Sequence, residues 1–72
     1  MNDIPRQPVV SSDIASIGYD PVTQTLDIEF KATGVYRYFS VPREVYEGFL
    51  QTPSPGRYFR QHVLGKYAWE KR

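Results

Sequence analysis

The chain has 72 residues and no cysteine, so it forms one domain at most, without a disulfide or a thiolate metal site. A chain this short buries only about 60% of its unfolded surface, so its aromatic residues, 15% of the total, are expected to supply much of the core. No apolar stretch approaches the roughly 20 residues of a membrane-spanning helix, and Met1–Pro8 lacks the apolar segment of a signal peptide. We therefore expect a cytoplasmic protein.

The net charge of +1 is unevenly distributed. Residues 1–36 carry two cations against five carboxylates, a net charge of −3, and residues 37–72 carry seven against three, a net charge of +4. Such a split is typical of a chain whose basic half meets a polyanion. An ordinary solvated surface with internal ion pairs would show the same split.

Three strands are predicted between residues 14 and 41. Ile14–Tyr19 alternates apolar and polar residues, and Asp20-Pro21 then favours a turn. Thr25–Phe30 shows the clearest alternation, with one buried and one solvated face. A second turn ends at Gly34, before Val35–Val41, which is rich in aromatic and β-branched residues. Two such short connections predict an antiparallel meander.

The faces of the third predicted strand depend on its register. The apolar face of the preceding strand consists of Leu26, Ile28 and Phe30. We expect Tyr36 and Tyr38 to share that face. Arg37 would then stand on the other face, opposite the carboxylates of Asp27 and Glu29. A register shift of one residue would reverse this arrangement.

Two helices are predicted after the strands. Pro42 suits the first turn of a helix, and Thr52-Pro53 ends that helix because the residue before proline avoids the helical region. Gly48, inside it, costs about 1 kcal/mol against alanine and is expected to allow close packing. Ser54 is predicted to cap a second helix, which ends near Gly65. The apolar stripes are Val45, Tyr46, Phe49 and Leu50 in the first helix and Tyr58, Phe59 and Val63 in the second.

The predicted fold class is α+β: a three-stranded antiparallel β-meander followed by two helices packed on one face (βββαα). Residues 1–10 are predicted to be a flexible N-terminal tail, residues 11–67 the folded domain and residues 68–72 a basic C-terminal tail.

An ordered set of residues along the chain resembles the KTSC domain, a family named for the C-terminus of certain lysyl-tRNA synthetases and also found as free-standing bacterial and phage proteins. The set is Ser11-Ser12, Ile17-Gly18-Tyr19-Asp20, Leu26, Phe30, Tyr36-Arg37-Tyr38, Val41-Pro42, Ser54-x-Gly56-x-Tyr58-Phe59 and Tyr67. The central Tyr-x-Tyr is the marker of the family. The resemblance spans Val10–Tyr67 and implies a small domain of unestablished function, for which attachment to a synthetase suggests RNA binding.

The basic half offers a candidate surface for nucleic acid, because interleaved cations and aromatic rings suit single-stranded RNA. Its residues are Arg37, Arg57, Arg60, Lys66, Tyr67, Trp69, Lys71 and Arg72. The leading hypothesis is therefore a small non-catalytic module that binds RNA, such as a tRNA, through its basic C-terminal half. The alternative is a protein–protein interaction module without a nucleic-acid ligand. Trp69 would be exposed in either case, unless it packs back on the sheet.

Other residues of the family pattern have both a structural and a functional interpretation. Tyr36 and Tyr38 would either stack on RNA bases or fill the core, and we favour the core because a small chain needs its rings inside. The start of the second helix, Ser54–Arg57, would either bind phosphate or simply be capped, and we favour capping. We therefore expect a structural role for Tyr36, Tyr38, Ser54, Gly56, Tyr58 and Phe59.

We expect no enzymatic activity. His62 has no cysteine beside it for zinc and no paired nucleophile. Asp27 and Glu29 are interpreted as the solvated side of a strand. The sequence has neither a glycine-rich phosphate loop nor a nucleophile elbow. No cofactor, metal or membrane partner is predicted.

Overall fold

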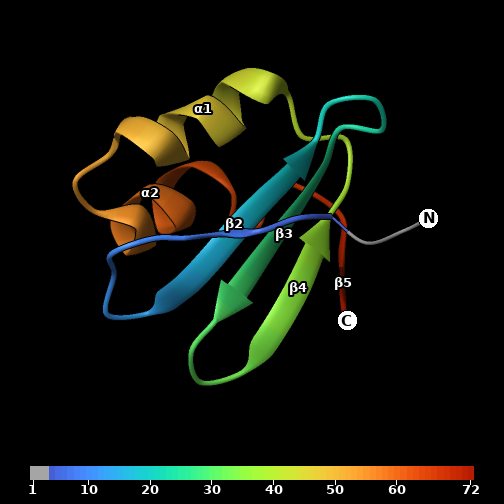
Figure 1. The fold of residues 1–72 in the computed structure, drawn as a ribbon. Coiled ribbons are helices and arrows are strands. Elements are labelled where there is room, and N and C mark those ends of the chain that lie inside the picture. Colours follow the sequence, from blue (N-terminus) through green and yellow to red (C-terminus); the bar gives the residue numbers. More distant parts are fainter. Residues whose placement is uncertain (1–3) are drawn as a thin grey trace.

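The computed structural model describes residues 4–72 as one antiparallel sheet of five strands with two helices on one side (Figure 1). The strands are β1 (Gln7–Pro8), β2 (Ile14–Asp20), β3 (Thr25–Phe30), β4 (Gly34–Tyr38) and β5 (Trp69–Lys71). The helices are α1 (Arg43–Gln51) and α2 (Pro55–His62). The strands are ordered in the sheet as they are in the chain, β1-β2-β3-β4-β5.

The predicted α+β class, the antiparallel pairing and the two helices are confirmed, but the predicted count of three strands is wrong. Both additional strands lie at the edges of the sheet, in segments predicted to be tails. β1 has two residues, which pair with Ile17 and Ser16 of β2, and β5 has three, which pair with β4. Strands this short have no periodic pattern of their own, so their pairing depends on the edges that the central meander offers.

The register of β3 and β4 assigns the two faces of the sheet. Leu26 lies opposite Tyr38 and Ile28 opposite Tyr36, whereas Asp27 lies opposite Arg37. The favoured prediction is therefore confirmed, since both tyrosines share the face of Leu26 and Ile28. We call the side toward α1 and α2 the helix face and the opposite side the polar face.

A bulge in β2 lets two isoleucines three residues apart point into the core. The register shifts between Ile14 and Ser16, so that Ile14 pairs with Phe30 and Ile17 with Ile28. Strict alternation would place Ile14 and Ile17 on opposite faces, but the extra residue of the bulge restores Ile14 to the helix face. Both side chains are fully buried.

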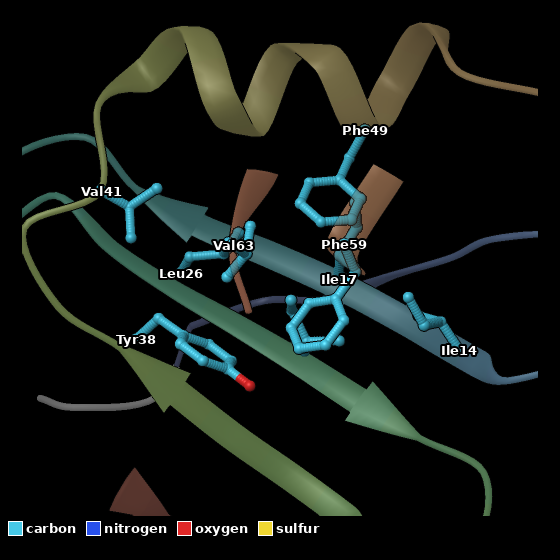
Figure 2. Close-up of a cluster of buried hydrophobic side chains, with 9 residues drawn as sticks. Ile14, Ile17, Leu26, Tyr38, Val41, Phe49, Phe59 and Val63 are labelled. Atoms are coloured by element: carbon cyan, nitrogen blue, oxygen red, sulfur yellow. The ribbon is translucent and has the colours of Figure 1, made fainter. Parts of the chain in front are cut away.

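The core lies between the helix face and the two helices (Figure 2). Its buried residues are Ile14, Ile17, Leu26, Ile28, Tyr38, Val41, Phe49, Phe59 and Val63. Phe59 of α2 joins the helix to the sheet, with its ring edge-on to Phe30 (centroids 5.0 Å apart) and to Tyr38 (5.8 Å). Aromatic rings thus supply much of the core, as the composition predicts.

The helices contact each other through Gly48 and Tyr58. The Tyr58 hydroxyl donates to the carbonyl oxygen of Val45 in α1 at 2.9 Å. It lies against Gly48, where any Cβ would overlap it. The close packing predicted for Gly48 is therefore confirmed. Burial raises the pKa of Tyr58, and the nearby Tyr67 adds to the rise.

Candidate ligand-binding surfaces

The predicted basic residues do not form one continuous surface. Arg37 is buried on the polar face, 9% exposed. Arg57 and Arg60 are exposed on α2, which lies at the left of Figure 1, whereas β5 lies at the right edge. The turn after α2 carries Lys66 and Tyr67, and β5 and the residue after it carry Trp69, Lys71 and Arg72.

Trp69 presents half of its surface to solvent at the edge of the sheet. Its side chain is 56% exposed, and its ring leans on that of Tyr36, with centroids 5.4 Å apart. Lys71 lies opposite Tyr36 in the ladder and so is on the same side of β5 as Trp69. We call Trp69, Lys71 and the supporting Tyr36 the β5 platform. Tyr67 is not part of it, because its ring is half-buried against the core.

The family's tyrosine pair is used mainly for packing. Tyr38 is only 4% exposed, and its burial raises the pKa of its hydroxyl to about 12, with a smaller contribution from Tyr36. The Tyr36 ring is half-buried between Phe30 (5.6 Å) and Trp69. Tyr38 therefore fills the core as predicted, and Tyr36 supports the exposed Trp69.

The start of α2 does not have the character of a phosphate site. Ser54 occupies the N-cap position as predicted, but its side chain makes no capping hydrogen bond. The Asp13 carboxylate lies close to Gly56 and pairs with Arg60 at 3.6 Å. A carboxylate already complements the positive end of this helix, so a phosphate would meet like charge. Tyr58 and Phe59 of the same motif are packing residues.

The polar face holds a buried ion pair at the centre of the sheet. Arg37 Nε and Nη2 donate to the two carboxylate oxygens of Asp27 at 2.8 and 2.9 Å. Asp27 is only 2% exposed. The predicted placement of Arg37 opposite this carboxylate is correct, but Asp27 belongs to a buried pair rather than to a solvated surface. A bidentate guanidinium–carboxylate pair fixes both side chains.

Beside this pair, a hydroxyl joins two further charged groups. Ser16 donates to Glu29 Oε1 at 2.8 Å and accepts from Arg6 Nε at 3.2 Å. The chain of contacts runs from the β1 segment across β2 to β3. Arg6 and Ser16 have no local pattern that marks them, because their meeting depends on how the N-terminal segment folds over the sheet.

A groove of about 960 Å³ lies over these groups. On one side the N-terminal segment passes over the sheet (Figure 1) and packs against Gly18, where a Cβ would overlap the Pro5 carbonyl. We call this hollow the polar groove; its lining residues are Ile4, Arg6, Ser16, Asp27, Glu29, Val35, Arg37, Lys71 and Arg72. Of the predicted surface, only Arg37, Lys71 and Arg72 contribute to it.

Within residues 4–72 there is neither a metal-binding cluster nor a membrane-spanning helix. No group of three or more His, Cys, Asp or Glu in this range is arranged to hold a metal ion. The same residues include no helix with the length and apolar character needed to cross a bilayer. His62 is exposed, and its ring lies against Tyr58 with centroids 4.3 Å apart.

This architecture is found in other proteins. The profile of the KTSC domain matches residues 10–67. The chain belongs to the KTSC domain family. A crystal structure of a KTSC domain protein from Yersinia pestis superposes with a TM-score of 0.94 at 41% identity, covering 97% of this chain and 99% of that one. The five-stranded sheet is thus similar to that of a KTSC domain solved as a free-standing chain.

Two relatives show the contexts in which similar KTSC domains occur. An uncharacterised protein of Stutzerimonas stutzeri is 45% identical over 56 residues, 78% of this chain and 79% of that protein. A lysine–tRNA ligase of Nostoc is 40% identical over 60 residues, which are 83% of this chain but 11% of the ligase. The domain is therefore similar both to most of a small protein and to a short segment of a synthetase.

Proposed function

We propose that this KTSC domain is an RNA-binding module that holds single-stranded RNA on the β5 platform. The observation that carries the proposal is the position of Trp69, which is 56% exposed on an edge strand with Lys71 on the same side. A single chain that needs its rings for the core leaves its only tryptophan half in solvent. An exposed indole beside a cation suits a nucleotide, because the ring stacks on the base and the cation attracts the backbone.

The relationship to a synthetase supports an RNA ligand. The Nostoc relative is named for a reaction on tRNA, and it contains a segment similar to most of this chain. Arg57 and Arg60, part of the predicted RNA surface, are left out of the proposed contact. They lie on α2, and Arg60 pairs with Asp13. RNA contacts are assigned here to β5 and its neighbours rather than to the whole basic half.

Tryptophan fluorescence tests this proposal directly, since Trp69 is the only tryptophan. We expect a short oligouridylate or a tRNA to quench the emission, with an affinity that falls as salt rises. The slope of log affinity against log salt is expected to be about −0.7 for each phosphate contacted. Trp69→Ala should weaken binding by about 1–3 kcal/mol, measured by polarisation of labelled RNA, and Trp69→Phe should weaken it less.

Leu50→Ala is the matched control, because Leu50 is 54% exposed on α1, away from β5. It should leave RNA affinity unchanged. Absence of both quenching and polarisation change at low salt would sink the RNA proposal. If Trp69 emission instead responds to a protein partner with little salt dependence, the platform serves protein interaction.

A further inference from the structure

The polar groove lies on the face of the sheet opposite α1 and α2, and the proposed function leaves it unused. We propose that the polar groove is a phosphate-binding site, and that it receives the backbone of the RNA strand whose base stacks on Trp69. The second part of this statement rests on the proposed function, whereas the phosphate chemistry stands on the groove itself.

The charges that line the groove favour an anion. Three guanidinium groups, from Arg6, Arg37 and Arg72, line it against the carboxylates of Asp27 and Glu29. Both carboxylates are already engaged, since Asp27 accepts two hydrogen bonds from Arg37 and Glu29 accepts one from Ser16. The engaged carboxylates form part of the floor, and a ligand entering from solvent meets cations on the two sides.

Arg6 is placed to donate to a phosphate from one side. It is exposed, and its Nε is held by the Ser16 hydroxyl at 3.2 Å. A guanidinium has five N–H donors in a planar fork, so the terminal nitrogens keep donors for two oxygens of one phosphate. The hydrogen bond to Ser16 fixes the direction of the side chain before a ligand arrives.

Arg72 provides a cation on the other side. It pairs with Glu70 at 2.6 Å, and the two side chains are 41% and 50% exposed. Exposed ion pairs contribute little, so a phosphate can take over this guanidinium. The backbone N–H of Arg72 donates to the Val35 carbonyl at 2.8 Å. This hydrogen bond continues the pairing of β5 with β4 and fixes the position of the Arg72 backbone.

The groove and the β5 platform are joined through β5. Trp69 and Lys71 are two residues apart, which is roughly 7 Å along a strand. Lys71 is on the side of Trp69, whereas the next residue, Arg72, lies beside Val35 on the side of the groove. A strand of RNA that folds around this edge of the sheet therefore meets Trp69 and Lys71 on one side and Arg72 on the other.

Inorganic tripolyphosphate is the decisive probe, because it carries phosphates and no base. NMR titration of the labelled full chain should shift the backbone amides of Arg6, Ser16, Val35 and Arg72, with little change in Trp69 emission. Arg6→Gln keeps a long polar side chain and removes the charge, so it should abolish these shifts. Arg43→Gln removes the same charge from α1 and should leave them intact.

The RNA arm uses the same variants. An oligouridylate should give the groove shifts and quench Trp69 together. Arg6→Gln should reduce the salt slope of RNA binding by about 0.7, the value for one lost phosphate contact, while the quenching at saturation remains. The amide spectrum of each variant, recorded without ligand, checks that the sheet is folded.

The failures are distinguishable. If neither probe shifts the groove amides, the groove proposal is overturned, whether or not Trp69 is quenched. If tripolyphosphate shifts them but RNA neither shifts them nor quenches Trp69, the phosphate site is supported and the RNA path is overturned. If a glutamate oligopeptide binds as tightly as tripolyphosphate, the phosphate assignment is overturned in favour of an acidic protein partner.

Discussion

The two faces of one sheet are buried in different ways. On the helix face, aliphatic side chains and aromatic rings pack against α1 and α2, with nine buried apolar residues in one cluster. On the polar face, the alternate residues of β3 and β4 include a buried ion pair, and Asp27 and Arg37 are 2% and 9% exposed. A single strand, β3, supplies Leu26 to one face and Asp27 to the other.

The difference shows what each kind of burial demands. Apolar burial gains free energy roughly in proportion to the area removed from water, so each side chain of the helix face contributes by itself. A buried charge is stable only with its partner, because desolvation offsets much of the attraction. The helix face is thus expected to tolerate graded changes, and the polar face to respond to the loss of one partner.

The largest expected effect comes from breaking the buried pair. Arg37→Ala leaves the Asp27 carboxylate without its bidentate donor at a position that is 2% exposed. We expect a loss of about 3–5 kcal/mol from a total of about 4–11 kcal/mol for a chain of this length. Urea denaturation followed by circular dichroism measures it.

The double variant Arg37→Met with Asp27→Leu distinguishes the cost of an unpaired buried charge from the cost of lost packing. Because both charges are replaced by apolar groups of similar size, most of the lost stability should return. A double variant as unstable as Arg37→Ala would mean that the cost arises from packing, and the contrast between the two faces would fail.

The helix face offers a smaller effect that depends on pH. Burial raises the pKa of Tyr38 to about 12, above the ordinary value of 10.0. Between these values the unfolded chain releases the proton and the folded chain keeps it, so the stability present below pH 10 is lost as pH rises toward 12. A shift of this size corresponds to about 2–3 kcal/mol. Urea denaturation at pH 8 to 12 should show the decline.

Tyr38→Phe is the control for this decline. It keeps the ring edge-on to Phe59 and removes the group that titrates. Its stability should fall less between pH 10 and 12 than that of the unmodified chain. A remaining fall is expected from Tyr19 and Tyr58, because burial raises the pKa of each. Equal declines in the two proteins would refute the assignment to Tyr38.

The helix face could be predicted from the sequence because its signals are local. Alternation along Thr25–Phe30 identifies the buried side of that strand. The charges then orient the next strand, since Arg37 pairs with Asp27 in the observed register. The helices follow from their prolines and apolar stripes, and Gly48 from the cost of glycine within a helix.

The polar groove could not be predicted, because it is built from segments distant in sequence. Arg6 meets Ser16 only after β1 pairs with β2, and Arg72 lies beside Val35 only after β5 pairs with β4. Edge strands of two and three residues have no alternation to detect. The excess of cations in residues 37–72 therefore does not predict one basic surface. In the folded chain these cations lie on several sides of the molecule.

The smallest predicted effect is at Ser16, near the edge of the polar face, where the charged groups of Arg6 and Glu29 are still in contact with water. Ser16→Ala removes the hydroxyl that joins Arg6 to Glu29. Both charged groups can be solvated again from the groove, so we expect a loss of only about 0.5–1.5 kcal/mol in urea denaturation. Ser54→Ala is the control, since Ser54 caps α2 without a side-chain hydrogen bond and its loss should cost less. A loss at Ser16 as large as that for Arg37→Ala would mean that this contact is shielded from water like the central pair, and the groove would then be too closed to admit a phosphate.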